Sequence, residues 1–72
     1  MYDDYIELAN AIILLAVKDY RKALRALAEY PDDSDNQLKK REVERFFRSK
    51  WFGMLTQLDP QTLISQLKLE VI

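Results

Sequence analysis

The sequence contains no cysteine and no histidine among its 72 residues. Without cysteine the chain forms no disulfide, and without thiolate or imidazole ligands a structural zinc site is nearly excluded. A chain of this length hides only about 60% of the surface that its unfolded form exposes, so small domains usually gain stability from disulfides, metals or a partner subunit. We therefore expect self-association to supply the missing reinforcement.

The chain also has little net charge and no long apolar run. Its formal net charge of -1 argues against a general attraction to polyanions. Asp3, Asp4 and Glu7 precede the seven-residue run AIILLAV, whereas a secretory signal begins with basic residues and a membrane-spanning helix takes about 20 apolar residues. The lack of cysteine fits a reducing compartment. We expect a cytoplasmic protein that makes no contact with membranes.

The sequence offers few residues suited to catalysis. Nucleophile-and-base catalysis usually needs histidine, cysteine or a carboxylate held in a cleft, and a few short helices offer little concave surface. We therefore expect no enzyme activity, no cofactor and no small-molecule substrate.

An acidic segment, PDDSD, follows the first apolar stretch. A calcium loop starting at Asp33 would place Asp35 third and Glu44 twelfth, but its sixth position is Leu38, where such a loop needs glycine. Helix capping is the favoured interpretation of these side chains.

The spacing of apolar residues predicts three helices in a single all-α domain, residues 1–72. No proline or glycine lies between positions 3 and 30, and apolar residues recur there at steps of three or four. A capping box from Ser34 to Gln37 starts a second helix, and Asp59 with Pro60 starts a third. The expected fold is a three-helix antiparallel bundle with a long first helix, over residues 3–30, 36–57 and 60–70. The third helix is expected beside the end of the second and the start of the first.

The stretch ERFFRSKWFGML, residues 44–55, decides how the second helix presents its aromatic residues. A continuous helix places Trp51 in the core, whereas Ser49 could instead cap a new short helix. Phe52 is then either covered by the third helix or exposed beside Arg48 as an anchor for a partner. Gly53 is expected to permit a close approach of two helices, or a kink. The predicted core is Ile13, Val17, Leu24, Phe47, Trp51, Leu55 and Leu63.

Basic residues gather in the middle of the sequence. Ten of the eleven lie between positions 18 and 50, against seven acidic residues in the same interval. They form either a solvated helical surface with weak ion pairs or a patch that contacts phosphates. The candidate contacts for a protein partner or a nucleic acid are Lys18, Arg21, Lys22, Arg25, Arg41, Arg45, Arg48, Lys50 and Phe52.

Residues 11–17 are apolar almost all round the first helix, yet one chain supplies only two other helices to cover them. Exposed apolar patches beyond a few hundred Å² usually mark an interface. We expect a homodimer through the first half of this helix and part of the third. The candidate dimer contacts are Ile12, Leu14 and Leu15.

The segments KDYRKALRAL (18–27) and ERFFRSKWFGMLTQLDPQTLISQL (44–67) resemble short proteins encoded by phages and integrative elements of Gram-positive bacteria. The aromatic pair, Ser49, the WF dipeptide and the later LI..L pattern carry this resemblance, which covers about half of the chain. It implies an accessory phage or mobile-element product in the bacterial cytoplasm. The leading functional hypothesis is a non-enzymatic interaction or regulatory protein, and the alternative is a small nucleic-acid-binding protein.

Overall fold

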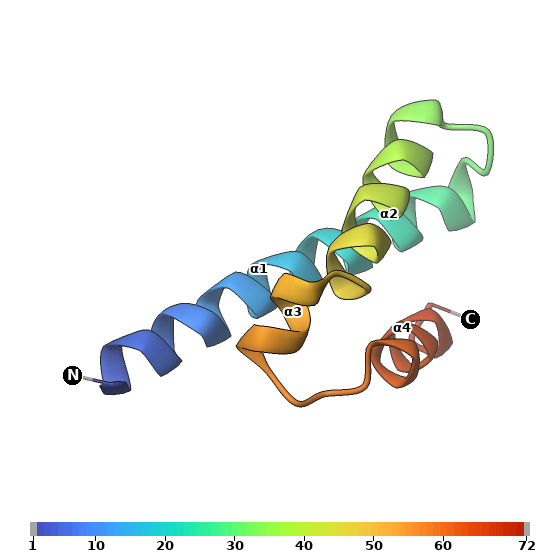
Figure 1. Ribbon diagram of the computed structural model, residues 1–72. Coiled ribbons are helices and arrows are strands. Elements are labelled where there is room, and N and C mark those ends of the chain that lie inside the picture. Colours follow the sequence, from blue (N-terminus) through green and yellow to red (C-terminus); the bar gives the residue numbers. More distant parts are fainter. Residues whose placement is uncertain (1, 72) are drawn as a thin grey trace.

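Residues 2–71 fold into four helices packed around one core. The computed structural model describes residues 2–71, with side chains from Ile6 to Val71. In chain order the helices are α1 (Tyr2–Glu29), α2 (Ser34–Phe47), α3 (Lys50–Leu55) and α4 (Pro60–Leu69). Figure 1 shows α2 running back along the second half of α1, with α3 beside the middle of α1, while the first turns of α1 extend beyond the other helices. The all-helical class and the long first helix are confirmed, but the predicted second helix is two helices.

The start of α2 is set by Asp33. Its Oδ1 accepts hydrogen bonds from the backbone N–H groups of Asp35 at 3.1 Å and Asn36 at 3.4 Å. The Asn36 side-chain amide also donates to Asp33, and this bond holds the pKa of Asp33 below its ordinary value. The predicted capping box from Ser34 to Gln37 is therefore wrong, because the cap lies one residue earlier than Ser34.

The predicted single helix over residues 36–57 breaks at Ser49. Its hydroxyl donates to the carbonyl of Phe46 at 2.6 Å and accepts from the N–H of Phe52 at 3.2 Å, so it ends one helix and caps the next. Phe52 is completely buried, whereas Trp51 is 53% exposed. Placing Trp51 in the core and Phe52 among the exposed contacts was wrong, because adjacent helical residues point about 100° apart and the break resets which of them faces inward.

The core is built around an aromatic cluster. The ring of Phe47 packs edge-on against Tyr20 at 5.6 Å and against Phe52 at 5.5 Å between centroids. Four predicted core residues are buried, namely Ile13, Val17, Leu24 and Phe47, while Leu55 and Leu63 are half-buried against them. The remaining buried side chains include Ala9, Ala23, Val43, Ile64 and Leu67.

Gly53 makes no close contact with another helix. A Cβ atom added to it would meet nothing within 4 Å. The prediction of a close helix–helix approach is wrong, because α3 turns this side of the chain toward solvent.

The last helix lies against the second half of α1. Asp59 accepts a hydrogen bond from the N–H of Thr62 at 2.9 Å, which confirms the predicted cap of α4. At the other end of α4, Arg21 donates two hydrogen bonds to Glu70, at 2.7 and 3.0 Å. Val71 lines a shallow hollow beside Arg25. The prediction that this helix covers the start of the first one is therefore wrong, and Ile6 and Leu8 remain exposed.

Candidate interaction surfaces

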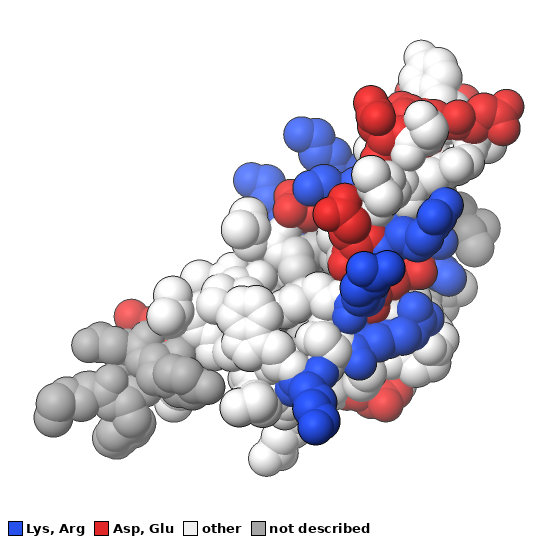
Figure 2. Space-filling view, turned by 45° about the horizontal axis from the view of Figure 1, so that its top comes forward, with Lys and Arg blue, Asp and Glu red and all other residues white. Residues whose placement is uncertain are grey.

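The first half of α1 presents large apolar side chains to solvent. Ile6, Leu8, Leu14 and Leu15 are between 50% and 65% exposed. Figure 2 shows mostly uncharged side chains over the part of the molecule that adjoins the start of α1, with charged ones gathered over the other half. Two of the predicted dimer contacts, Leu14 and Leu15, are thus exposed in the single chain.

Beside these residues lies a groove between α1 and α2, with a volume of about 200 Å³. Its apolar lining comes from both helices: Ile12, Leu15, Ala16, Val43 and Phe46. Its charged rim comprises Asp19, Lys39 and Glu42. The groove thus has an apolar floor and a polar edge, which is the form taken by sites that bind an amphipathic helix.

An aromatic contact links the groove to α3. The ring of Phe46, which lines the groove, packs edge-on against the indole of Trp51 at 5.6 Å between centroids. We call the connected residues Leu8, Ile12, Leu15, Phe46 and Trp51 the apolar surface.

Sequence reasoning missed Leu8, Phe46 and Trp51 as surface residues. A signal for Leu8 was present, because Leu8, Ile12 and Leu15 recur at steps of four and three and form a second stripe beside the core stripe of α1. Trp51 is exposed because the helix breaks at Ser49. The sequence alone allowed either a continuous helix or a new helix capped by Ser49.

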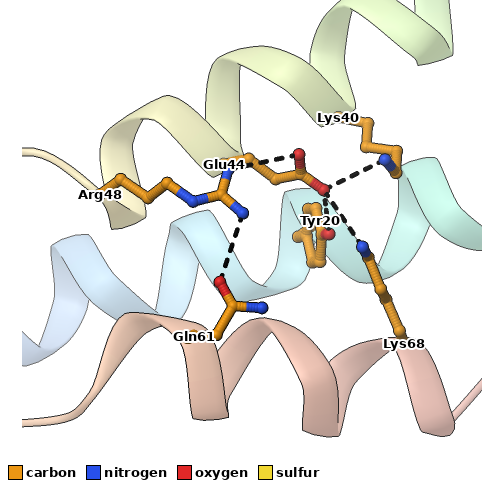
Figure 3. A network of polar contacts seen from close by, with 6 residues as sticks. All are labelled: Tyr20, Lys40, Glu44, Arg48, Gln61 and Lys68. Atoms are coloured by element: carbon orange, nitrogen blue, oxygen red, sulfur yellow. Dashed lines mark hydrogen bonds and ion pairs between the residues drawn. The ribbon is translucent and has the colours of Figure 1, made fainter.

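A polar network joins three helices on another side of the molecule (Figure 3). The Glu44 carboxylate, only 13% exposed, lies at its centre. It accepts a hydrogen bond of 2.5 Å from the hydroxyl of Tyr20 and pairs with the ammonium group of Lys40 at 3.1 Å. Lys68 of α4 approaches it at 3.9 Å and Arg48 at 3.7 Å. The network therefore ties α1, α2 and α4 together.

The same contacts shift the acidities of both central groups. Burial tends to raise the pKa of the Glu44 carboxyl, but the hydrogen bond from Tyr20 and the ammonium group of Lys40 outweigh it, so this pKa lies below its ordinary value. Burial, followed by the hydrogen bond to Glu44, raises the pKa of the Tyr20 hydroxyl well above its ordinary value. Both shifts favour the pair as found, with a neutral phenol donating to a charged carboxylate.

Glu44 therefore does not belong to a calcium loop. It lies in the middle of α2, whereas Asp33 caps the start of that helix, and eleven residues of helix separate them by roughly 16 Å. Among the described side chains, no group of three or more acidic residues lies close enough together to hold a metal ion.

The predicted basic contacts fall into separate groups. Lys18, Lys22 and Arg25 are exposed on α1, and Arg21 is held by Glu70. The predicted contacts from α2 to the start of α3 are Arg41, Arg45, Arg48 and Lys50, and all four are exposed. Figure 2 shows basic side chains in several groups with acidic and uncharged ones between them.

The two main groups lie on different helices. On α1 Lys22 points away from the core residues Val17 and Tyr20, and on α2 Arg41 and Arg45 point away from Val43 and Phe47. Since the two helices pack core side to core side, the fold does not bring all the predicted contacts onto one surface. We call the exposed arginines of α2, Arg41, Arg45 and Arg48, the basic surface.

Comparison of the chain with known protein families, with curated proteins and with solved structures found no match. Within residues 2–71, no helix combines the length and apolar character that a membrane crossing requires.

Proposed function

We propose that this chain is a non-enzymatic interaction protein that acts by binding other proteins. The apolar surface is the observation that carries this proposal. Leu8, Leu15 and Trp51 are each more than half exposed around an open apolar groove, and exposed apolar clusters of this kind usually mark binding sites. Aromatic residues at such sites often supply a large share of the binding energy.

The proposed setting is the cytoplasm of a bacterial cell, where the chain serves as an accessory phage or mobile-element product. The resemblance of residues 18–27 and 44–67 to short proteins of phages and integrative elements supports this setting. In that role it binds a host or phage protein, or a second copy of itself, and regulates by occupying a surface rather than by chemistry.

A capture experiment tests the proposal. Tagged protein is incubated with a host-cell lysate to which untagged protein has been added, and retained proteins are identified by mass spectrometry. We expect the wild type to retain a protein in stoichiometric amounts and the Leu15→Glu variant to lose it, because a carboxylate placed in an apolar contact loses its hydration. Leu14→Glu is the matched control, since Leu14 is similarly exposed but does not line the groove. If Leu15→Glu changes nothing that is retained, the apolar surface is not the binding site.

Nucleic-acid binding is the second candidate function, and the basic surface favours it. Arg41, Arg45 and Arg48 are exposed along one side of α2, and clustered arginines can neutralise phosphates and release counterions. Arg48 and the nearby Lys40 and Lys68 also pair with Glu44, which reduces the charge that these three residues offer to a ligand.

Gel shifts with mixed DNA and RNA at increasing salt test this candidate. A phosphate-driven complex weakens steeply as salt rises, and Arg41→Ala with Arg45→Ala should lower the salt dependence. Lys18→Ala with Lys22→Ala makes the same change in charge on α1, outside the basic surface, and should have a smaller effect. The absence of any complex at low salt would reject nucleic-acid binding.

A further inference from the structure

We propose that the groove between α1 and α2 is filled by the first half of α1 from a second copy of this chain, in an antiparallel, two-fold symmetric dimer. The inference rests on the proposed function and names the first protein that the apolar surface binds. Each copy then supplies both a groove and the helix that fills the groove of the other.

The exposed apolar area is close to what such a contact needs. Leu8 and Leu15 each expose on the order of 100 Å² of apolar side-chain surface to solvent. With Trp51 and the open floor of the groove, the available apolar area is on the order of 400 Å² per copy. A stable homodimer buries about 800 Å² per copy, of which about two thirds is apolar. The surface therefore supplies most of the apolar area of such a contact without any rearrangement of the core.

The spacing along α1 suits a two-fold axis. Leu8 and Leu15 stand at nearly equal distances on either side of a point between Ala11 and Ile12, on one face of the helix. When two copies of α1 lie antiparallel about that point, Leu8 of one copy lies opposite Leu15 of the other, and the symmetry repeats the contact. The first turns of α1, which extend beyond the other helices in Figure 1, then lie along the groove of the second copy.

The charges beside this stripe are compatible with the antiparallel direction. Glu7 and Lys18 are both exposed, on the same flank of α1 and on opposite sides of the proposed axis. An antiparallel pair brings Glu7 of one copy within about two residue positions of Lys18 of the other, close enough for the long lysine side chain to form an ion pair. In a parallel two-fold pair this flank of one copy and the same flank of the other lie on opposite sides of the contact, so Glu7 and Lys18 would not meet.

Leu14 lies outside this contact. Neighbouring helical residues point about 100° apart, so Leu14 is directed away from the groove that Leu15 lines. Of the three predicted dimer residues, the geometry places Ile12 and Leu15 in the interface and leaves Leu14 at its edge.

Cysteine crosslinking tests the geometry directly, because the chain has no cysteine of its own. Ala11→Cys places one thiol from each copy next to the two-fold axis, whereas Ala28→Cys places a thiol at an exposed position near the far end of the same helix. In the proposed dimer the two thiols of the Ala28→Cys variant are about 50 Å apart. With a short bifunctional thiol reagent, Ala11→Cys should form a covalent dimer readily and Ala28→Cys should not.

Light scattering after size exclusion supplies the second measurement. We expect a dimer mass at tens of micromolar for the wild type and Leu14→Glu, and a folded monomer for Leu15→Glu. Leu15→Glu should raise the dissociation constant roughly tenfold or more, because the symmetry places two new carboxylates in one contact.

Three results would overturn the inference: a monomeric wild type, a Leu15→Glu variant that dimerises as well as the wild type, or equal crosslinking of the two cysteine variants. If Leu15→Glu does not fold, the crosslinking comparison still decides. A monomeric wild type that nonetheless captures a host protein through the apolar surface would overturn the dimer and leave the proposed function standing.

Discussion

Phe52→Ala and Trp51→Ala replace two neighbouring aromatic residues, of which the first is buried and the second is exposed. Phe52 is completely buried and packs against Phe46 and Phe47 at 5.7 and 5.5 Å between ring centroids. Replacing a buried phenylalanine by alanine removes apolar burial and leaves a cavity, which costs about 3–5 kcal/mol. Trp51 is already 53% exposed, so its loss leaves no closed cavity and should cost about 1–2 kcal/mol.

These magnitudes are large for a chain of this size. At about 0.05–0.15 kcal/mol per residue, the whole domain is stable by about 4–11 kcal/mol. Phe52→Ala should therefore remove a large part of the free energy of unfolding, and Trp51→Ala a small part. With a urea dependence of about 1 kcal/mol per molar, the midpoints should fall by about 3 M or more and by about 1–2 M respectively.

Urea unfolding followed by circular dichroism measures both variants. If Phe52→Ala has no folded baseline, Phe52→Leu and Trp51→Leu provide a milder pair in which the same order is expected. The measurements are made at two protein concentrations, because any contribution from association appears as a concentration dependence. A larger loss of stability from Trp51→Ala than from Phe52→Ala at both concentrations would show that the helix continues through Ser49 and that the reasoning is wrong.

Three further substitutions test other features. Gly53→Ala should raise the free energy of unfolding by about 0.5–1 kcal/mol, because the added methyl group meets no neighbour and alanine favours the helix; a decrease in urea unfolding would contradict this. Glu44→Gln should make stability depend less on pH under acidic conditions. Because the pKa of Glu44 is lowered in the folded state, its carboxylate stabilises the fold above about pH 4.3, and this contribution is lost as the pH falls through the folded-state pKa. An unchanged slope below pH 5 in thermal unfolding would refute this role. Tyr20→Phe should make stability depend less on pH under alkaline conditions. Because the pKa of Tyr20 is raised in the folded state, its neutral hydroxyl stabilises the fold fully below about pH 10, and this stabilisation is lost progressively above that pH. An equal loss of stability in the variant and the wild type between pH 9 and 11 would contradict this.

The helices with strong local signals were predictable from sequence. The first helix was predicted over residues 3–30 and runs from Tyr2 to Glu29, because a long apolar period uninterrupted by proline or glycine has no good alternative structure. Asp59 and Pro60 marked the start of α4 correctly, because capping chemistry is local.

The aromatic stretch was predictable only in part. The spacing of apolar residues favoured a continuous helix, whereas Ser49 favoured a cap and a new helix. Both patterns are present in the sequence, and they predict different structures. A break at that residue rotates everything after it relative to the core, so the choice between two local structures decided whether Trp51 or Phe52 is buried. Packing of Phe52 against Phe46 and Phe47 settled this choice, and packing is not visible in local spacing.

The polar network had no local signal at all. Tyr20 and Glu44 are 24 residues apart, and each alone resembles an ordinary residue of an amphipathic helix. Likewise, the basic residues of α1 and α2 form one cluster along the sequence, but the packing of the two helices divides them into separate groups (Figure 2).

The extension of α1 beyond the other helices has a consequence for hydrogen exchange. Ala9 is the first buried side chain among those described, and Ile6, Glu7 and Leu8 before it are exposed. The turns of helix that hold these three residues gain little from packing of their side chains, and a short helical segment with few tertiary contacts is marginally stable in water. These turns should open without unfolding the core, and amides near Glu7 should exchange by local opening while those near Phe47 follow global unfolding. A second copy that binds these turns must first order them, so part of its binding energy is spent on completing a helix. The protection of these amides should therefore rise with protein concentration, which makes the end of α1 a direct reporter of association.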